Sequence, residues 1–208
     1  MIDVSGLVLA GGRSARLGTD KRAVRLDGVT LLDRALGLVA GLSDDVMVAA
    51  PPDALTADRT VRIIPDAMPG RGPLAGILAG LTQARQERVL VIPVDMPMLR
   101  ATFLRFLVGV DPDAAVTVPT WTAGLEPLVA VYHAACASAI AEFLAHGSAA
   151  VHTFINSTAL RVHRVEEQDI RRYGEPSDLF HNINTPEDLP RAEAMLRRMR
   201  PGGGPRSP

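Results

Sequence analysis

The chain has very little cysteine and few aromatic side chains. Its 208 residues include one cysteine, Cys136, and aromatic residues make up 4% of the composition. A single cysteine excludes a disulfide framework within the chain and also excludes a thiolate metal cluster. Because Cys136 lies in an alanine-rich stretch typical of helix, we interpret it as a small buried apolar residue.

The sequence also lacks a long apolar run and an excess of charge of one sign. No segment approaches the roughly 18 apolar residues of a membrane span, and the first residues lack the charged region of a signal peptide. The formal net charge is -1, so no broad basic field attracts nucleic acid. We therefore expect a cytoplasmic protein with no membrane or nucleic-acid partner.

Several familiar site motifs are absent. The glycine-rich segment near the N-terminus is neither a Walker A sequence nor a GxGxxG fingerprint, which disfavours a P-loop GTPase. The histidines do not occur as HxH or HExxH, so we assign no zinc site. No GxSxG elbow is present either.

What is present is an alternation of apolar strands and amphipathic helices. The patterns predict strands over residues 5–10, 45–50, 61–64 and 89–93, with helices from Thr30 and over residues 74–84 and 99–108. Strands that are apolar at every position favour a mostly parallel sheet covered on both faces, which is a three-layer α/β fold.

The second half of the chain is less regular. Its patterns predict strands over residues 114–119, 125–132 and 160–165, helices over 134–145 and 149–155, and a last helix capped by Thr185. We expect one domain over residues 1–200, with a nucleotide-binding N-terminal half and an acceptor-binding C-terminal half. Residues 201–208 are expected to be a disordered tail.

The first candidate site is a glycine-rich loop after the first strand. Residues 9–21 read LAGGRSARLGTDK and bring Arg13, Arg16 and Lys21 close together. Glycines let backbone N–H groups approach a ligand, and the basic side chains add positive charge, so the loop can cradle a triphosphate. The alternative is an exposed loop whose basic residues are simply solvated.

Two further loops belong to the same edge of the predicted sheet. Asp95 follows a buried strand and is suited to hold Mg²⁺, although an Asp ahead of a proline also forms ordinary turns. Asp66 can accept from base or ribose groups, and Gly72 opens a helix whose N-terminus favours an anion. The alternative for this second loop is a plain connection ending in a proline-started helix.

A fourth segment carries paired amides. Asn182 and Asn184 face the same side if the segment is extended, and two amides can read a polar heterocycle. The alternative is that they cap the helix that follows.

Together these four segments resemble the molybdenum cofactor guanylyltransferases. The matching motifs are LAGG-x-S-x-R-L-G-x-D-K, GPLAG, an apolar strand ending in D-x-P, and N-I-N-T-P-E-D-L, and they run in order from about Ser5 to Leu189. Residues 126–132, EPLVAVY, also resemble the family's P-L-x-A-x-Y strand. The resemblance implies a Rossmann-like fold of the nucleotide-diphospho-sugar transferase type, with Mg²⁺ as cofactor, GTP as donor, and molybdopterin, free or on a carrier protein, as acceptor.

The resemblance also implies roles for individual residues. Lys21 and Asp95, with Arg16, would be catalytic; Asp95 would bind the metal; Asn182 and Asn184 would lie on the acceptor side. Nucleotide binding is expected from the loop and strand-end residues Leu9, Ala10, Gly11, Gly12, Arg13, Lys21, Asp66, Gly72 and Asp95. Gly12 favours guanine, because related cytidylyltransferases usually have L-A-A-G at this point.

One departure and three alternatives remain at this stage. Relatives often place an Asn after the second strand, whereas this chain has Ala49 and Ala50 followed by prolines. The alternatives are a molybdenum cofactor cytidylyltransferase, a sugar-phosphate nucleotidyltransferase and a nucleotide-binding protein without catalysis. We expect a monomer or a weak homo-oligomer.

Overall fold

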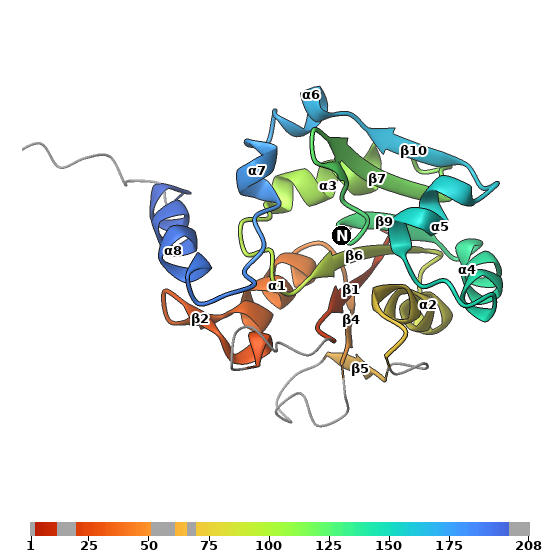
Figure 1. Ribbon diagram of the computed structural model, residues 1–208, viewed down its shortest axis with the longest axis horizontal. Coiled ribbons are helices and arrows are strands. Elements are labelled where there is room, and N and C mark those ends of the chain that lie inside the picture. Colours follow the sequence, from red (N-terminus) through yellow and green to blue (C-terminus); the bar gives the residue numbers. More distant parts are fainter. Residues whose placement is uncertain (1–2, 12–19, 51–60, 66–69, 200–208) are drawn as a thin grey trace, which may run out of the picture.

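The computed structural model describes residues 3–11, 20–50, 61–65 and 70–199. They form a central sheet with helices on both sides (Figure 1). The strands are β1 (Ser5–Leu9), β2 (Arg25–Leu26), β3 (Val29–Thr30), β4 (Asp45–Ala49), β5 (Arg62–Ile64), β6 (Arg88–Pro93), β7 (Val116–Trp121), β8 (Gly124–Leu125), β9 (Ala130–His133) and β10 (Val162–Val165). The helices are the short 3₁₀ helix η1 (Lys21–Ala23), α1 (Leu31–Ala40), α2 (Pro73–Gln83), α3 (Ala101–Gly109), α4 (Cys136–Ala145), α5 (Val151–Ser157), α6 (Glu167–Ile170), α7 (Pro176–Leu179) and α8 (Asp188–Met199).

The main sheet is mostly parallel, as the sequence predicts. Its order is β10-β7-β9-β6-β1-β4-β5, with β8 paired to β7 outside this path. The pairs β6–β1, β1–β4, β4–β5 and β10–β7 are parallel, whereas β9 is antiparallel to both of its neighbours. The ends of β1, β4 and β6 therefore meet at one edge, with Leu9 opposite both Ala49 and Pro93.

Apolar side chains on the two faces of the sheet form two separate cores. On one face, Val8 and Ile92 pack among residues of α1, α3, α7 and α8. On the other face, Leu7 and Val91 pack among residues of α2, α4 and α5. Figure 1 shows α2, α4 and α5 grouped together, away from α1, α3 and α8. This arrangement explains why the central strands are apolar on both faces beyond their first residues, and it confirms the three-layer α/β prediction.

Local signals place several elements where the sequence predicts them. Thr30 caps α1, because its hydroxyl oxygen accepts from the N–H of Asp33 at 3.0 Å. Cys136 is buried and donates its thiol to the carbonyl of Ala115 at 3.1 Å. Burial raises the pKa of this thiol to about 11. Cys136 is therefore the inert buried residue that its context indicates.

Two predicted elements have different bounds in the structure. The strand predicted over residues 125–132 is interrupted by a turn, in which Val129 N–H donates to the carbonyl of Glu126. The last helix begins at Asp188, two residues later than predicted from Thr185 as its cap. The Asp188 carboxylate accepts from the backbone N–H groups of Asn184 and Thr185 at 2.8 Å each. The Asp188 side chain thus reaches back to backbone N–H groups just ahead of the helix, in the manner of a capping box.

A buried carboxylate ties the opposite ends of β1 and β4 to the loop before β6. Asp45 is 5% exposed and accepts from Ser5 Oγ at 2.6 Å and from the backbone N–H of Arg85 at 2.9 Å. Arg62 donates to it through Nε and Nη2 at 3.0 and 2.6 Å. Burial by itself would raise the pKa of Asp45, but these hydrogen bonds outweigh burial and hold the pKa below its ordinary value.

The remaining organisational predictions have different outcomes. Among the described residues, no helix combines the length and apolar character needed to cross a membrane. The expected tail, residues 201–208, lies outside the described residues. That residues 1–200 form one domain stays a prediction.

Candidate functional site

The site is built where β1, β4 and β6 end. Ala10 N–H donates to the carbonyl of Ala49, and Val94 N–H donates to the carbonyl of Leu9, both at 3.0 Å. These bonds continue the sheet by one residue beyond the strands. Leu9 and Ala10 are buried, and Gly11 is exposed directly after them. The described part of the predicted nucleotide loop thus starts at the carboxyl edge of the sheet, where α/β proteins bind their ligands.

Three predicted site residues meet beside this edge. Lys21 Nζ donates to Asp95 Oδ2 at 2.8 Å and to Asn184 Oδ1 at 2.8 Å. The side chains of Lys21 and Asp95 are each 20% exposed. The contact joins residues that the sequence assigned separately to phosphate, metal and acceptor. We call Lys21, Asp95 and Asn184 the cation cluster.

Short local structures hold each member of the cation cluster. Lys21 begins η1, whose N-cap Asp20 accepts from the N–H of Arg22 at 3.0 Å. The ion pair and side-chain hydrogen bond to Arg22 are the main reason that the pKa of Asp20 is lowered. Asp95 follows β6, and its carbonyl accepts from the N–H of Ile183 at 2.9 Å. Asn184, which contacts Lys21, follows Ile183 directly. The segment is held in place by the buried side chain of Ile183 and by its backbone hydrogen bond to Asp95.

The oxygen atoms of the cation cluster are suited to bind a divalent metal ion. Carboxylate and amide oxygens are ligands that Mg²⁺ accepts, and here one of each already binds the same ammonium group. Within the described part of the chain, no three His, Cys, Asp or Glu side chains gather as a metal site. Such a metal would therefore depend on Asp95, the neighbouring amide and oxygen atoms of a substrate.

The helix N-terminus that the sequence predicts to face an anion is the N-terminus of α2. Gly72 is the N-cap of α2 with a φ of 74°, a left-handed conformation that favours glycine, and Pro73 follows at the first helical position. Neighbouring Arg71 donates through Nη1 to the carbonyl of Leu144 at 3.3 Å. This contact directs Arg71 to the C-terminal end of α4.

Other predicted residues fall into two groups. Gly12, Arg13, Arg16 and Asp66 lie outside the described residues, so their roles stay predictions. Asn182 is half-buried between His181 and Ile183 in the segment that carries Asn184. The assignment of Asn182 to the acceptor also stays a prediction.

Glu126 is a candidate that the sequence interpretation missed. It lies in the turn between β8 and β9, where its N–H donates to the carbonyl of Pro119 at 3.0 Å. Burial raises the pKa of Glu126 to about 7; the Trp121 indole acts in the opposite direction, and the negative charge of Asp95 adds to the increase. The only sequence signal was an acidic residue inside an otherwise apolar strand pattern. A carboxyl group with a raised pKa near Asp95 is a candidate functional group.

Replacing Glu126 with Gln should stabilise the fold at pH 8 but not at pH 4. The folded-state pKa of Glu126, about 7, exceeds the ordinary value for a glutamate. The free energy of unfolding therefore falls as the pH rises from about 4.3 to 7, and this loss of stability is complete above pH 7. Gln carries no charge and avoids the penalty, which we place on the order of 2 kcal/mol. Urea unfolding at both pH values measures it, with exposed Glu142→Gln as the control for a lost surface charge. Equal stability of wild type and Glu126→Gln at pH 8 would contradict the raised pKa.

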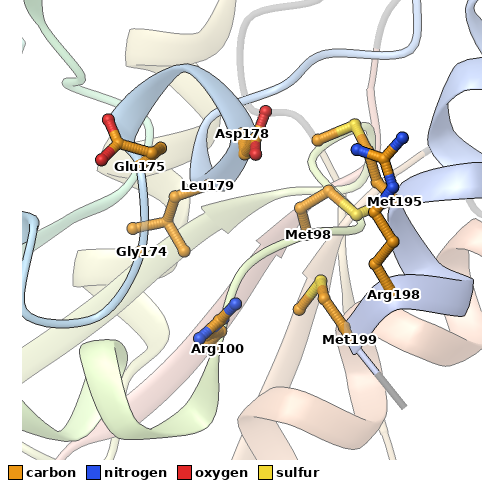
Figure 2. A pocket seen from close by; sticks show the side chains of 9 residues that line it. All are labelled: Met98, Arg100, Gly174, Glu175, Asp178, Leu179, Met195, Arg198 and Met199. Atoms are coloured by element: carbon orange, nitrogen blue, oxygen red, sulfur yellow. The ribbon is translucent and has the colours of Figure 1, made fainter. Parts of the chain in front are cut away.

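A pocket is present elsewhere on the protein. It is lined by residues before α3, around α7 and on α8, namely Met98, Arg100, Gly174, Glu175, Asp178, Leu179, Met195, Arg198 and Met199 (Figure 2). None of these residues belongs to the cation cluster or to the predicted nucleotide loop. Its lining combines three methionines with charged side chains, and we assign the pocket no part in the chemistry.

The fold and the cation cluster define a class of protein. A mostly parallel sheet with a glycine-containing strand end, a lysine and a carboxylate at one edge is the arrangement of an α/β protein that binds a phosphorylated ligand. Comparison with known proteins agrees: residues 6–163 match the family model described as MobA-like NTP transferase domain.

Relatives of nearly equal length match over most of the chain. A molybdenum cofactor guanylyltransferase of Desulfosudis oleivorans is 35% identical over 93% of this chain and 96% of its own. Another of the same name, from Syntrophotalea carbinolica, is 29% identical over 98% of this chain and 95% of its own. The crystal structure of molybdopterin-guanine dinucleotide biosynthesis protein A from Archaeoglobus fulgidus has 26% identity and a TM-score of 0.81, covering 94% of this chain and 100% of that one. The chain belongs to the MobA-like nucleotidyltransferase family.

Proposed function

We propose that the protein transfers GMP from GTP to the terminal phosphate of molybdopterin, forming the guanine dinucleotide cofactor and releasing pyrophosphate. The observation that carries the proposal is the cation cluster, in which Lys21, Asp95 and Asn184 meet at the edge of the sheet. The names of the relatives supply the substrates. We further infer a cytoplasmic enzyme that acts as a monomer or weak homo-oligomer, with molybdopterin free or delivered by a carrier protein.

The reaction requires positioning and charge neutralisation more than acid–base catalysis. A phosphate oxygen of the acceptor attacks the α-phosphorus of GTP in line with the bond to the leaving pyrophosphate, and that bond breaks as the new P–O bond forms. Lys21, with Arg13 or Arg16, neutralises the negative charge that grows on the pyrophosphate. Asp95 would hold Mg²⁺, and the bound ion would neutralise negative charge on phosphate oxygens.

Different segments of the chain bind the nucleotide and the acceptor, and these segments meet at the cation cluster. On the nucleotide side, the backbone from Leu9 to Gly12 contacts the phosphates and the base. Asp66 accepts a hydrogen bond from the nucleoside. The N-terminus of α2 at Gly72 contributes N–H groups that favour an anion. These roles are proposals that the position of Leu9, Ala10 and Gly11 at the sheet edge supports.

On the acceptor side, Asn182 and Asn184 offer amide groups to the pterin ring. Glu126 adds a carboxyl group near Asp95, on the turn that follows β8. The acceptor phosphate therefore has to reach the α-phosphorus of GTP beside Asp95, between the residues on the nucleotide side and those on the acceptor side.

Pyrophosphate release tests the nucleotide assignment. Purified protein with Mg²⁺ and molybdopterin-loaded carrier is supplied with ATP, CTP, GTP or UTP in separate reactions. We expect release with GTP at least about 100-fold faster than with the others, since a site that hydrogen-bonds one base leaves its polar groups unpaired with another. A preference for CTP would identify a cytidylyltransferase, and binding of GTP without release from any nucleotide would indicate a binding protein.

A further inference from the structure

A half-buried carboxyl group lies close to Asp95 at the end of β6. The antiparallel register of β6 and β9 places Ala130 opposite Val91, so the residues before Ala130 run towards those that follow Val91. Glu126 and Asp95 lie on these two continuations, and the negative charge of Asp95 acts on the Glu126 carboxyl group. Glu126 is therefore near the reacting groups of the proposed reaction.

The strand order places Glu126 on the opposite side of β6 from the nucleotide loop. Strand β9 is next to β6 on one side, and β1 and β4 follow β6 on the other side (Figure 1). The glycine-containing loop starts after β1, whereas Glu126 precedes β9. A ligand at Glu126 therefore faces the nucleotide across the end of β6, which is the place of the acceptor in the proposed reaction.

Hydrogen bonds fix the backbone around Glu126. Its N–H donates to the carbonyl of Pro119, and its carbonyl accepts from the N–H of Val129, both at 3.0 Å. The hydroxyl of the buried Tyr132 donates to the carbonyl of Pro127 at 2.7 Å. The carboxyl group thus extends from a turn of fixed shape, as recognition of a rigid ring requires.

The carboxyl group of Glu126 is shielded from water and has few donors around it. Burial raises its pKa to about 7, and the Trp121 indole acts on it as a donor. Among the described residues, the buried Nε1 of Trp121 still lacks a hydrogen bond of full geometry. A ligand that supplies two N–H groups would replace the water that the carboxylate has lost and would stabilise its charge.

We propose that Glu126 binds the pterin ring of the acceptor at its pyrimidine edge, where the ring N–H and the exocyclic amino group donate side by side. Two parallel hydrogen bonds from this donor pair match the two oxygens of a carboxylate. The inference rests on the proposed function, because it takes the acceptor to be a pterin. Guanine carries the same donor pair, so the experiment compares both sources.

Binding of a free pterin to the protein alone measures this contact. The ligands are 6-hydroxymethylpterin and the corresponding lumazine, in which an oxygen replaces the amino group, and the anisotropy of their own fluorescence reports binding. We expect wild type to bind the pterin roughly tenfold more tightly, because the lumazine places an oxygen against the carboxylate. The bound ring should also quench the emission of Trp121, the chain's sole tryptophan.

The substitution Glu126→Gln should remove or reverse this preference. An amide can accept from the ring N–H and donate to the lumazine oxygen, whereas its NH₂ group opposes the amino group of the pterin. We expect pterin affinity to fall about tenfold and lumazine affinity to rise. Exposed Glu142→Gln is the matched control and should bind both ligands as wild type does. Guanosine, measured by equilibrium dialysis, should bind equally to wild type and Glu126→Gln.

Several outcomes would overturn the proposal. Wild-type protein that binds pterin and lumazine equally, or binds neither, has no carboxylate at the amino edge. A Glu126→Gln protein that keeps the pterin preference would remove Glu126 from the contact, and weaker guanosine binding with unchanged pterin binding would assign Glu126 to the nucleotide. These titrations contain neither GTP nor a phosphorylated acceptor, so their failure is distinct from failure of the proposed GMP transfer, which product analysis tests.

Discussion

Replacing Asp95 with Asn should lower GTP-dependent turnover by about 1000-fold, because charge stabilisation by a metal contributes several kcal/mol to the transition state. The substitution keeps the shape of the side chain and removes its negative charge. The fold should survive, since Asp95 is bound to Ile183 through its backbone carbonyl and its side chain pairs only with the partly exposed Lys21 among the described contacts. Initial rates of pyrophosphate release measure the effect.

The control for this prediction removes a carboxylate far from the site. Asp113→Asn changes the net charge equally at an exposed position before β7 and should keep full activity. The assignment of Asp95 to the metal fails if Asp95→Asn turns over within tenfold of wild type, or if its loss of activity is accompanied by unfolding.

The largest effect on stability should come from Asp45. Asp45→Ala removes the acceptor of Ser5, of two nitrogen atoms of Arg62 and of a backbone N–H, at a position 5% exposed. We expect the free energy of unfolding to fall by about 3 kcal/mol, at the low end for breaking a buried charge pair because Arg62 can still reach solvent. Urea denaturation at pH 7 measures the loss.

The same carboxylate predicts the direction of acid sensitivity. Because the folded-state pKa of Asp45 is lowered, its contribution is complete above the unfolded value of about 3.9 and is lost as the pH falls through the lower folded-state pKa. Exposed Asp44→Ala is the matched control and should change stability by less than about 0.5 kcal/mol. If Asp44→Ala and Asp45→Ala were equally stable, the buried network would have no structural role.

Much of the fold could be predicted because the physical signals are local. Strand β6 is apolar and buried from Val89 to Pro93 because helices cover both of its faces, and such a short apolar run is typical of a parallel core strand. Thr30 caps α1 with a side chain that is next to the helix in the sequence. Where one residue decides the start of an element from close by, the sequence is sufficient.

The predicted bounds differ from the structure where distant or competing contacts determine the ends of an element. The turn after Glu126 is stabilised partly by the hydroxyl of Tyr132, which donates to the carbonyl of Pro127 at 2.7 Å, whereas the strand-like residues around it predicted continuity. Just before α8, the side chain of Asp188 accepts from the backbone N–H groups of Asn184 and Thr185, and propensity alone does not show whether Asp188 or Thr185 makes the capping contact.

The site shows the same division. The motifs identified Lys21, Asp95 and Asn184 individually, because each stands out against its own segment. The sequence predicts Lys21 and Asp95 at one edge of the sheet, but the contact of Asn184 with the same ammonium group could not be predicted, since Lys21 and Asn184 are 163 positions apart. Glu126 escaped notice because its raised pKa depends on burial and on Asp95, and neither is visible in the neighbouring sequence.

The most direct test of the account is to identify the product. The protein is incubated with Mg²⁺, GTP and molybdopterin-loaded carrier, and the products are analysed by mass spectrometry together with the pyrophosphate released. The account predicts molybdopterin-guanine dinucleotide in equal amount to pyrophosphate. A different dinucleotide, or GTP consumed to GDP and phosphate with no dinucleotide formed, would contradict it.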